Sequence, residues 1–156
     1  MARLELKRGR VMSVVLLAAV LLSGTDPARG AERFVLEFNG EAVRDTKTGL
    51  IWEREPDREH DIWSRSLERC ATKEVGGQKG WRPPTIEEIK TLVDPDQNDP
   101  SLPPDHPFIG IRSEIYWTST PHPTDDIVAW QQSFLTGQAV TDQKSGMRRL
   151  WCVLGK

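Results

Sequence analysis

Short hydrophobic segments separated by polar turns run along most of the chain and predict a mixture of strands and helices. Apolar and polar residues alternate from Phe34 to Phe38, which predicts a strand. The apolar residues Leu50 to Trp52 follow the turn-like segment Asp45 to Gly49, so we expect a second short strand there. Four apolar segments in the C-terminal half are also predicted strands: residues 115–117, 127–134, 139–140 and 150–154.

A first helix is predicted from the spacing of apolar residues in the middle of the chain. These residues recur at spacings of four, three and one: Trp63, Leu67, Cys70 and Ala71. This spacing places them on one face of a helix that runs to about residue 73 or 74. Gly76-Gly77 is expected to end that helix.

A second helix is marked by a capping box, Thr85-Ile86-Glu87-Glu88, which follows Pro83-Pro84. Its apolar face is expected to consist of Ile86, Ile89, Leu92 and Val93. From Asp94 to Pro107, five prolines and four aspartates leave no room for a regular element. We therefore expect an ordered surface loop there, and an α+β domain in which the N- and C-terminal strands meet in one sheet.

The N-terminal 30 residues have the pattern of a secretory signal peptide. Basic residues, among them Lys7 and Arg10, precede an uncharged apolar run from Val11 to Leu22, and small residues occupy positions 28 and 30. The run is shorter than the roughly 18 to 20 residues that span a bilayer. An uncleaved signal anchor is the alternative. Either way, we expect a single exported domain over residues 31–156, in the periplasm or at the cell surface.

Charge and cysteine content narrow the possible partners and the compartment. Residues 31–156 carry 16 Lys and Arg against 21 Asp and Glu, a formal charge of −5, which argues against nucleic acid as the main partner. No later apolar run is long enough for a membrane helix. The two cysteines, Cys70 and Cys152, favour a disulfide in an exported chain, closing a loop of 83 residues. Two buried, unpaired thiols are the alternative reading.

An ordered set of motifs resembles the Lcl C-terminal domain family. The motifs follow one another in this order: Val43 to Trp52 (VRDTKTGLIW), Trp63, Cys70, Gly80 to Ile89 (GWRPPTIEEI), Leu92 to Asp94 (LVD), Tyr116 to Thr120 (YWTST), Ala129 to Gly137, and Leu150 to Val153 (LWCV). The resemblance covers roughly residues 34 to 155, and the ordered set is specific although each motif alone is weak.

The resemblance implies a C-type-lectin-like fold of the kind shared with formylglycine-generating enzymes, with two helices packed on short antiparallel strands. The family's namesake is the C-terminal domain of a collagen-like adhesin that binds sulfated glycosaminoglycans. The family pair of cysteines matches Cys70 and Cys152 and implies a structural disulfide. Two residues depart from the pattern: Pro83 stands where the family usually has Leu, and Trp151 where it often has Arg.

Six tryptophans could offer flat faces for sugar rings, but most lie within apolar segments and are expected to fill the core. Trp81 and Trp130 are flanked by polar residues, so we expect these two to be partly exposed and available to a ligand.

Two groups of charged residues are candidate ion sites. Asp94, Asp96, Asn98 and Asp99 supply the oxygen ligands that calcium prefers, but a solvated acidic turn in which they cap local backbone groups is the preferred interpretation. They do not form an EF-hand, because Asp99 stands in place of its glycine and Asp105 in place of its glutamate. The second group could form an anion-binding patch or simply be ordinary surface charge: Arg112, Lys144, Arg148 and Arg149.

No catalytic constellation is visible in the sequence. The histidines His60, His106 and His122 lack the spacing of a zinc site, and no nucleophile elbow or phosphate-binding loop occurs. We therefore expect a non-enzymatic exported recognition module without a cofactor, binding a glycan or an envelope protein. The alternatives are a structural or assembly subunit of a cell-envelope complex and a small exported enzyme.

Overall fold

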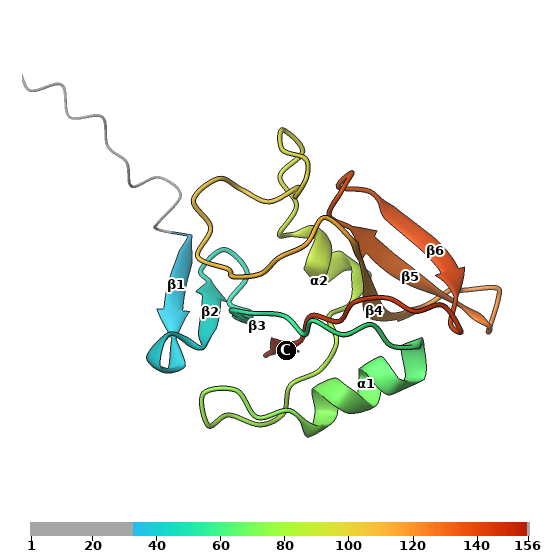
Figure 1. Ribbon diagram of the computed structural model, residues 1–156, viewed down its shortest axis with the longest axis horizontal. Coiled ribbons are helices and arrows are strands. Elements are labelled where there is room, and N and C mark those ends of the chain that lie inside the picture. Colours follow the sequence, from blue (N-terminus) through green and yellow to red (C-terminus); the bar gives the residue numbers. More distant parts are fainter. Residues whose placement is uncertain (1–32, 156) are drawn as a thin grey trace, which may run out of the picture.

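The computed structural model describes residues 33–155, so the predicted signal peptide lies outside the described residues. Within this part, two antiparallel sheets and two α-helices confirm the α+β class (Figure 1). The strands are β1 (Phe34–Glu37), β2 (Ala42–Asp45), β3 (Ile51–Glu53), β4 (Ile115–Pro121), β5 (Val128–Ser133), β6 (Ala139–Gln143) and β7 (Val153–Leu154). The helices are α1 (Trp63–Thr72) and α2 (Ile86–Lys90), and a short 3-10 turn, Phe38–Gly40, follows β1.

The first sheet joins the two ends of the described chain. Its order is β1-β2-β3-β7, and Trp52 of β3 pairs with Val153 of β7. This pairing confirms that the N- and C-terminal strands meet in one sheet. The pattern does not predict β2, because its consecutive residues Ala42 and Val43 are both buried and the alternation of a half-buried strand is lost.

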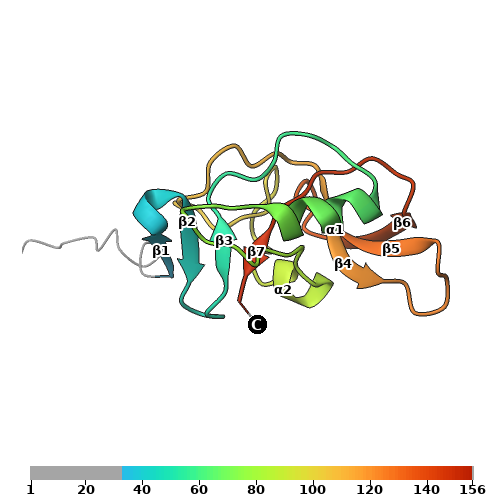
Figure 2. The same ribbon diagram turned by 90° about the horizontal axis from the view of Figure 1, so that it is seen from below.

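The second sheet has the order β4-β5-β6 and lies on the other side of α2. Ile115 pairs with Ser133 and Trp117 with Gln131, and the register shifts between Trp117 and Pro121. Figures 1 and 2 both place α2 between the two sheets. In Figure 1, the long segment from residue 94 to residue 114 passes above α2.

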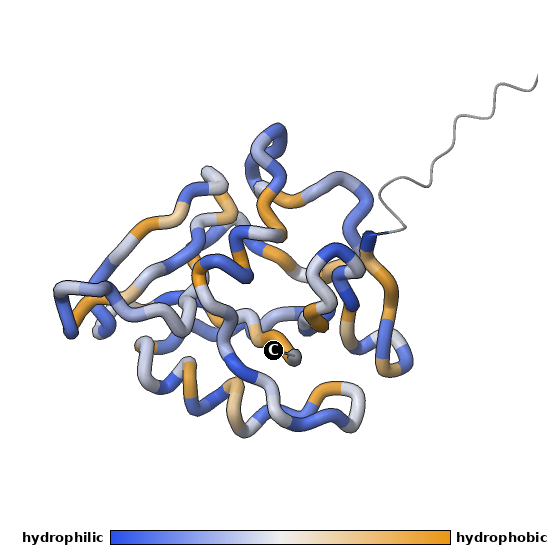
Figure 3. The backbone as a smooth tube through the Cα atoms, turned by 180° about the vertical axis from the view of Figure 1, so that it is seen from behind, coloured by the Kyte–Doolittle hydropathy of each residue, from blue (hydrophilic) through white to orange (hydrophobic). Residues whose placement is uncertain are grey.

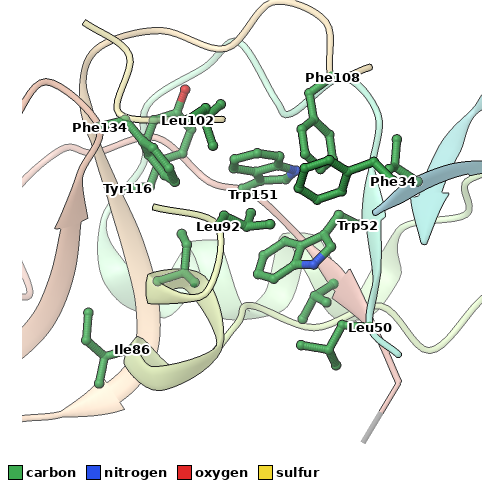
Figure 4. Packing of buried hydrophobic residues seen from close by; sticks show 13 residues of the cluster. Phe34, Leu50, Trp52, Ile86, Leu92, Leu102, Phe108, Tyr116, Phe134 and Trp151 are labelled. Carbon is green, nitrogen blue, oxygen red and sulfur yellow. The ribbon is translucent and has the colours of Figure 1, made fainter. Parts of the chain in front are cut away.

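Trp151 lies at the centre of the main hydrophobic core (Figure 4). Its ring meets Phe108 edge-on at 4.8 Å between centroids, Trp52 at 5.5 Å and Phe134 at 5.6 Å. Its Nε1 donates a hydrogen bond of 2.9 Å to the carbonyl oxygen of Glu53. Trp151 therefore places a large apolar side chain in the core with its one polar atom satisfied.

Helix α1 forms where it was expected, but the predicted buried face is partly wrong. Ser66 and Cys70 are buried, whereas Ala71 is exposed. Cys70 faces inward because it is bonded to Cys152, and Ser66, one turn earlier, shares that face. Gly76-Gly77 does not end the helix, which stops at Thr72; it forms the turn of a small bridge between Val75 and Gln78.

Helix α2 has the predicted capping box. The Thr85 hydroxyl accepts a hydrogen bond of 3.2 Å from the backbone N–H of Glu88, whose carboxylate accepts one of 2.8 Å from the N–H of Thr85. Ile86 and Ile89 are buried as expected, and so is Leu92 just beyond the helix.

The predicted disulfide is confirmed. Cys70 of α1 and Cys152 are bonded, with their Cα atoms 5.6 Å apart. They belong to a second, smaller core with Ala42, Trp81 and Leu150. Beside them, the buried carboxylate of Glu53 accepts a hydrogen bond of 2.8 Å from the N–H of Cys152 and pairs with Lys73. Burial raises the pKa of Glu53 above its ordinary value, although Lys73 and this hydrogen bond act in the opposite direction.

The segment from Asp94 to Pro107 has no regular element, as predicted, but it is more than a surface loop. Leu102 lies in the main core, and the N–H of Ser101 donates a hydrogen bond of 2.7 Å to the carbonyl of Phe134.

Figure 3 shows hydrophobic positions as short segments between hydrophilic ones along the chain. Within residues 33–155, no helix has the length and hydrophobicity needed to cross a membrane.

Candidate functional site

A groove of about 390 Å³ lies where the end of β4, the middle of β5 and α2 meet. We call it the Trp130 groove and define it by its lining residues: Ile86, Glu87, Lys90, Thr120, Pro121, Pro123 and Trp130. The neighbours of Trp130 on β5, Ala129 and Gln131, are buried. Because side chains alternate along a strand, the indole lies on the opposite face from both of them, where it packs at the edge of the main core.

Trp130 is half-buried, which confirms the predicted partial exposure. The imidazole of His122 stacks on it, with 6.3 Å between ring centroids and 22° between the planes. His122 is not one of the groove-lining residues. The two rings form an aromatic pair beside the groove, and Trp130 itself lines it.

The polar groups at the groove come from α2 and β4. The Thr120 hydroxyl accepts a hydrogen bond of 2.9 Å from the N–H of Ile86. Glu87 and Lys90, one turn apart, form an ion pair of 3.2 Å, and the Glu87 side chain is 78% exposed. The groove therefore combines an aromatic face and prolines with a hydroxyl, a carboxylate and an ammonium group.

Trp81 does not share this exposure, and its predicted role at the surface is wrong. It is 1% exposed in the smaller core, and its Nε1 donates 2.8 Å to the carbonyl of Gln78. The turn that places Gln78 there satisfies the polar atom of the indole, so the whole ring can be buried despite its polar sequence neighbours. The expectation of a core role is confirmed for Trp52, Trp117 and Trp151.

A second cleft, of about 500 Å³, lies at the opposite end of β4. We call it the Glu114 cleft and define it by its lining residues: His60, Ser113, Glu114, Ile115, Ser133, Leu135, Met147 and Arg148. His60 Nε2 lies 2.6 Å from a Glu114 oxygen, and Arg149 Nε lies 3.1 Å from the other. Burial acts to raise the pKa of Glu114, but the hydrogen bonds and charges of His60 and Arg149 outweigh it and hold the pKa below its ordinary value.

The four cations of the predicted anion patch have separate surroundings. Arg149 is buried, contrary to its predicted place at the surface, because it donates to the carbonyls of Asp57 and Arg58 at 3.3 and 3.2 Å. Arg148 pairs with Asp142. Lys144 donates 2.5 Å to the Asp126 carbonyl and lies over the Trp63 ring at 4.4 Å. Within residues 33–155, only Arg112 of the four has a side chain without a partner.

The acidic loop shows local capping. The Asp94 carboxylate accepts a hydrogen bond of 2.9 Å from the N–H of Asp96, and Asn98 and Asp99 are exposed. In the part of the chain that the structure describes, no group of three or more His, Cys, Asp or Glu side chains could hold a metal ion. The three histidines lie apart: His60 pairs with Glu114, His106 lies against Phe108, and His122 stacks on Trp130.

The sequence gives no local signal for most of the residues that line the two clefts. His60 and Glu114 are 54 positions apart, and Glu87 and Trp130 come from different elements, so no local spacing connects them. The only signal for the groove was Trp130 itself, an aromatic residue followed by two polar ones, Gln131 and Gln132.

Comparison with curated proteins gives no match. Comparison with protein families gives a match over residues 41–154 to the Lcl C-terminal domain. That range contains both sheets except β1, both helices and both cysteines. The chain therefore belongs to the Lcl C-terminal domain family.

Proposed function

We propose that this chain is an exported, non-enzymatic recognition module that binds glycans or surface polysaccharide through the Trp130 groove. The observation that carries the proposal is the half-buried Trp130 in an open groove beside Thr120, Glu87 and Lys90. An indole face suits the C–H face of a sugar ring, and neighbouring polar groups can fix the ring hydroxyls.

The proposal includes a C-type-lectin-like fold and an extracytoplasmic location. Two helices against short antiparallel strands, with β7 paired to β3, support the fold. The disulfide between Cys70 and Cys152 supports export, since such bonds persist in oxidising compartments.

A binding screen tests this function. The purified, oxidised protein is titrated with neutral, acidic and sulfated glycans, in calcium and again in chelator. Saturable binding supports the proposal, and its loss in chelator would show that binding requires calcium. Absence of binding across the screen contradicts glycan recognition.

A second candidate function is assembly of an envelope complex through the Glu114 cleft. Leu135 and Met147 at this cleft are 49% and 52% exposed, which is high for large apolar side chains. This alternative predicts one defined protein partner that is lost when Leu135 and Met147 are replaced by Asp, together with no response to glycans.

A further inference from the structure

We propose that the Trp130 groove selects an uncharged sugar ring and rejects sulfated or carboxylated glycans. This inference rests on the proposed function and specifies its ligand. It follows from the charges at the groove, from the aromatic surface, and from the positions of the chain's other cations.

The groove offers no unpaired cation to an anionic group. Lys90 is the one basic residue among its lining residues, and it is already paired with Glu87 at 3.2 Å. Recognition of sulfate or carboxylate uses an arginine fork or a cluster of free cations, and the lining contains neither.

The loop that leaves the groove also disfavours an anion. Pro121 ends β4 at the groove and Pro123 follows it in the loop to β5, which then carries the exposed carboxylates of Asp125 and Asp126. Lys144, which reaches this loop, donates to the Asp126 carbonyl and covers Trp63, so it is engaged away from the groove. A polyanion approaching Trp130 would meet more negative than positive charge.

The groups that remain suit hydroxyl-rich, uncharged rings. Glu87, 78% exposed, can accept hydrogen bonds from ring hydroxyls, and Lys90 can donate to them. The Thr120 oxygen accepts from the N–H of Ile86, and no described residue accepts a bond from its hydroxyl proton, which is available to a ligand oxygen. Trp130, which lines the groove and pairs with the His122 ring, provides the stacking face.

The test compares neutral with anionic oligosaccharides by titration calorimetry on the purified, oxidised protein. The neutral probes are cellohexaose, chitohexaose and mannohexaose, and the anionic probes are a heparin hexasaccharide and oligogalacturonate. We expect saturable binding of a neutral probe whose affinity changes less than about twofold when salt is raised, because no ion pair is screened. Trp130→Ala should weaken it by about tenfold or more.

Two further variants keep the test decisive if Trp130→Ala folds poorly. Trp130→Phe retains an aromatic face and should bind more weakly than the wild type but more tightly than Trp130→Ala. Leu36→Ala, an exposed apolar residue of β1 that lines neither cleft, is the control and should bind as the wild type does.

The outcomes separate the two proposals. Binding of anionic probes alone, lost in Trp130→Ala, would overturn the selectivity and leave glycan recognition in place. Binding of a neutral probe that Trp130→Ala does not change would overturn the location and with it this inference. Absence of binding to every probe would overturn both.

Discussion

At the residue scale, two tryptophans of this chain have different surroundings and therefore different expected roles. Trp151 is fully buried among aromatic rings, and its Nε1 is bonded to Glu53. Trp130 is half-buried beside a groove, with His122 stacked on it. The first is expected to determine stability, and the second binding.

Replacing each tryptophan by alanine tests this contrast. Trp151→Ala should lower the free energy of unfolding by about 3–5 kcal/mol, because it leaves a large cavity and an unpaired buried carbonyl. Trp130→Ala should lower it by about 1 kcal/mol, since much less buried surface is lost. Urea unfolding measures both values, and equal losses would contradict the assignment of Trp151 to the core centre and of Trp130 to a site.

Asp45 should make stability depend on acid pH. It is buried at the end of β2, and Arg33 donates to its two carboxylate oxygens at 2.9 and 2.8 Å. Burial acts to raise the pKa of Asp45, but these bonds and the N–H of Lys47 outweigh it and hold the pKa below its ordinary value.

The direction of this pH dependence follows from the difference in proton binding between the folded and the unfolded protein. Because the pKa of Asp45 is lower in the folded than in the unfolded protein, its ionised form stabilises the fold above the ordinary pKa, and this stabilisation is lost as the pH falls through the folded value. Asp45→Asn should lower the unfolding free energy at pH 7 by about 1–3 kcal/mol and flatten its decline below about pH 4. Asp96→Asn, in the exposed loop, is the control; an unchanged acid profile in Asp45→Asn would refute the prediction.

At the element scale, the α2 capping box gives a specific prediction. Thr85→Ala removes the acceptor for the Glu88 N–H and should lower the unfolding free energy by about 1 kcal/mol. Thr72→Ala, at the exposed end of α1, removes only a hydroxyl bonded to its own helix and should change it by less than about 0.5 kcal/mol. Thermal or urea unfolding compares the variants. An equal effect at both threonines would mean that the capping box adds nothing to the free energy of unfolding.

Elements with a local signature could be predicted from sequence, and those that depend on distant contacts could not. Four consecutive residues form the α2 capping box, and β4 and β5 each begin with three apolar residues, IYW and VAW. In contrast, β2 ends in Asp45, a turn-like residue that is buried because Arg33 neutralises it. Trp81 was misassigned because the Gln78 carbonyl that satisfies its indole comes from a turn the pattern did not specify.

In the candidate site, too, only the residue with a local signal could be predicted. Trp130 could be selected because the polar residues Gln131 and Gln132 follow it, but its partners Glu87, Lys90 and Thr120 come from two other elements. The position of Arg149 could not be foreseen, because its partners, the carbonyls of Asp57 and Arg58, lie about ninety residues earlier in the chain.

At the scale of the whole molecule, the disulfide holds α1 to the C-terminal segment that reaches the first sheet. Replacing Cys70 and Cys152 together by Ser should lower the unfolding free energy by about 2–5 kcal/mol, because the unfolded chain regains the freedom of a long loop. Urea unfolding with and without reductant measures this. The double variant should be insensitive to reductant, and a wild type equally insensitive would contradict the structural role of the bond.

A glycan ring that binds against Trp130 should shift the signal of its indole N–H, which nuclear magnetic resonance observes. The chain has six tryptophans, and Trp130→Phe identifies the signal of Trp130 in a nitrogen-15 correlation spectrum. During titration with the neutral oligosaccharides, we expect a saturable shift of that signal, while those of the buried Trp52, Trp117 and Trp151 stay in place. A saturable titration in which the Trp130 signal does not move, or no response to any of the sugars, would contradict binding at Trp130.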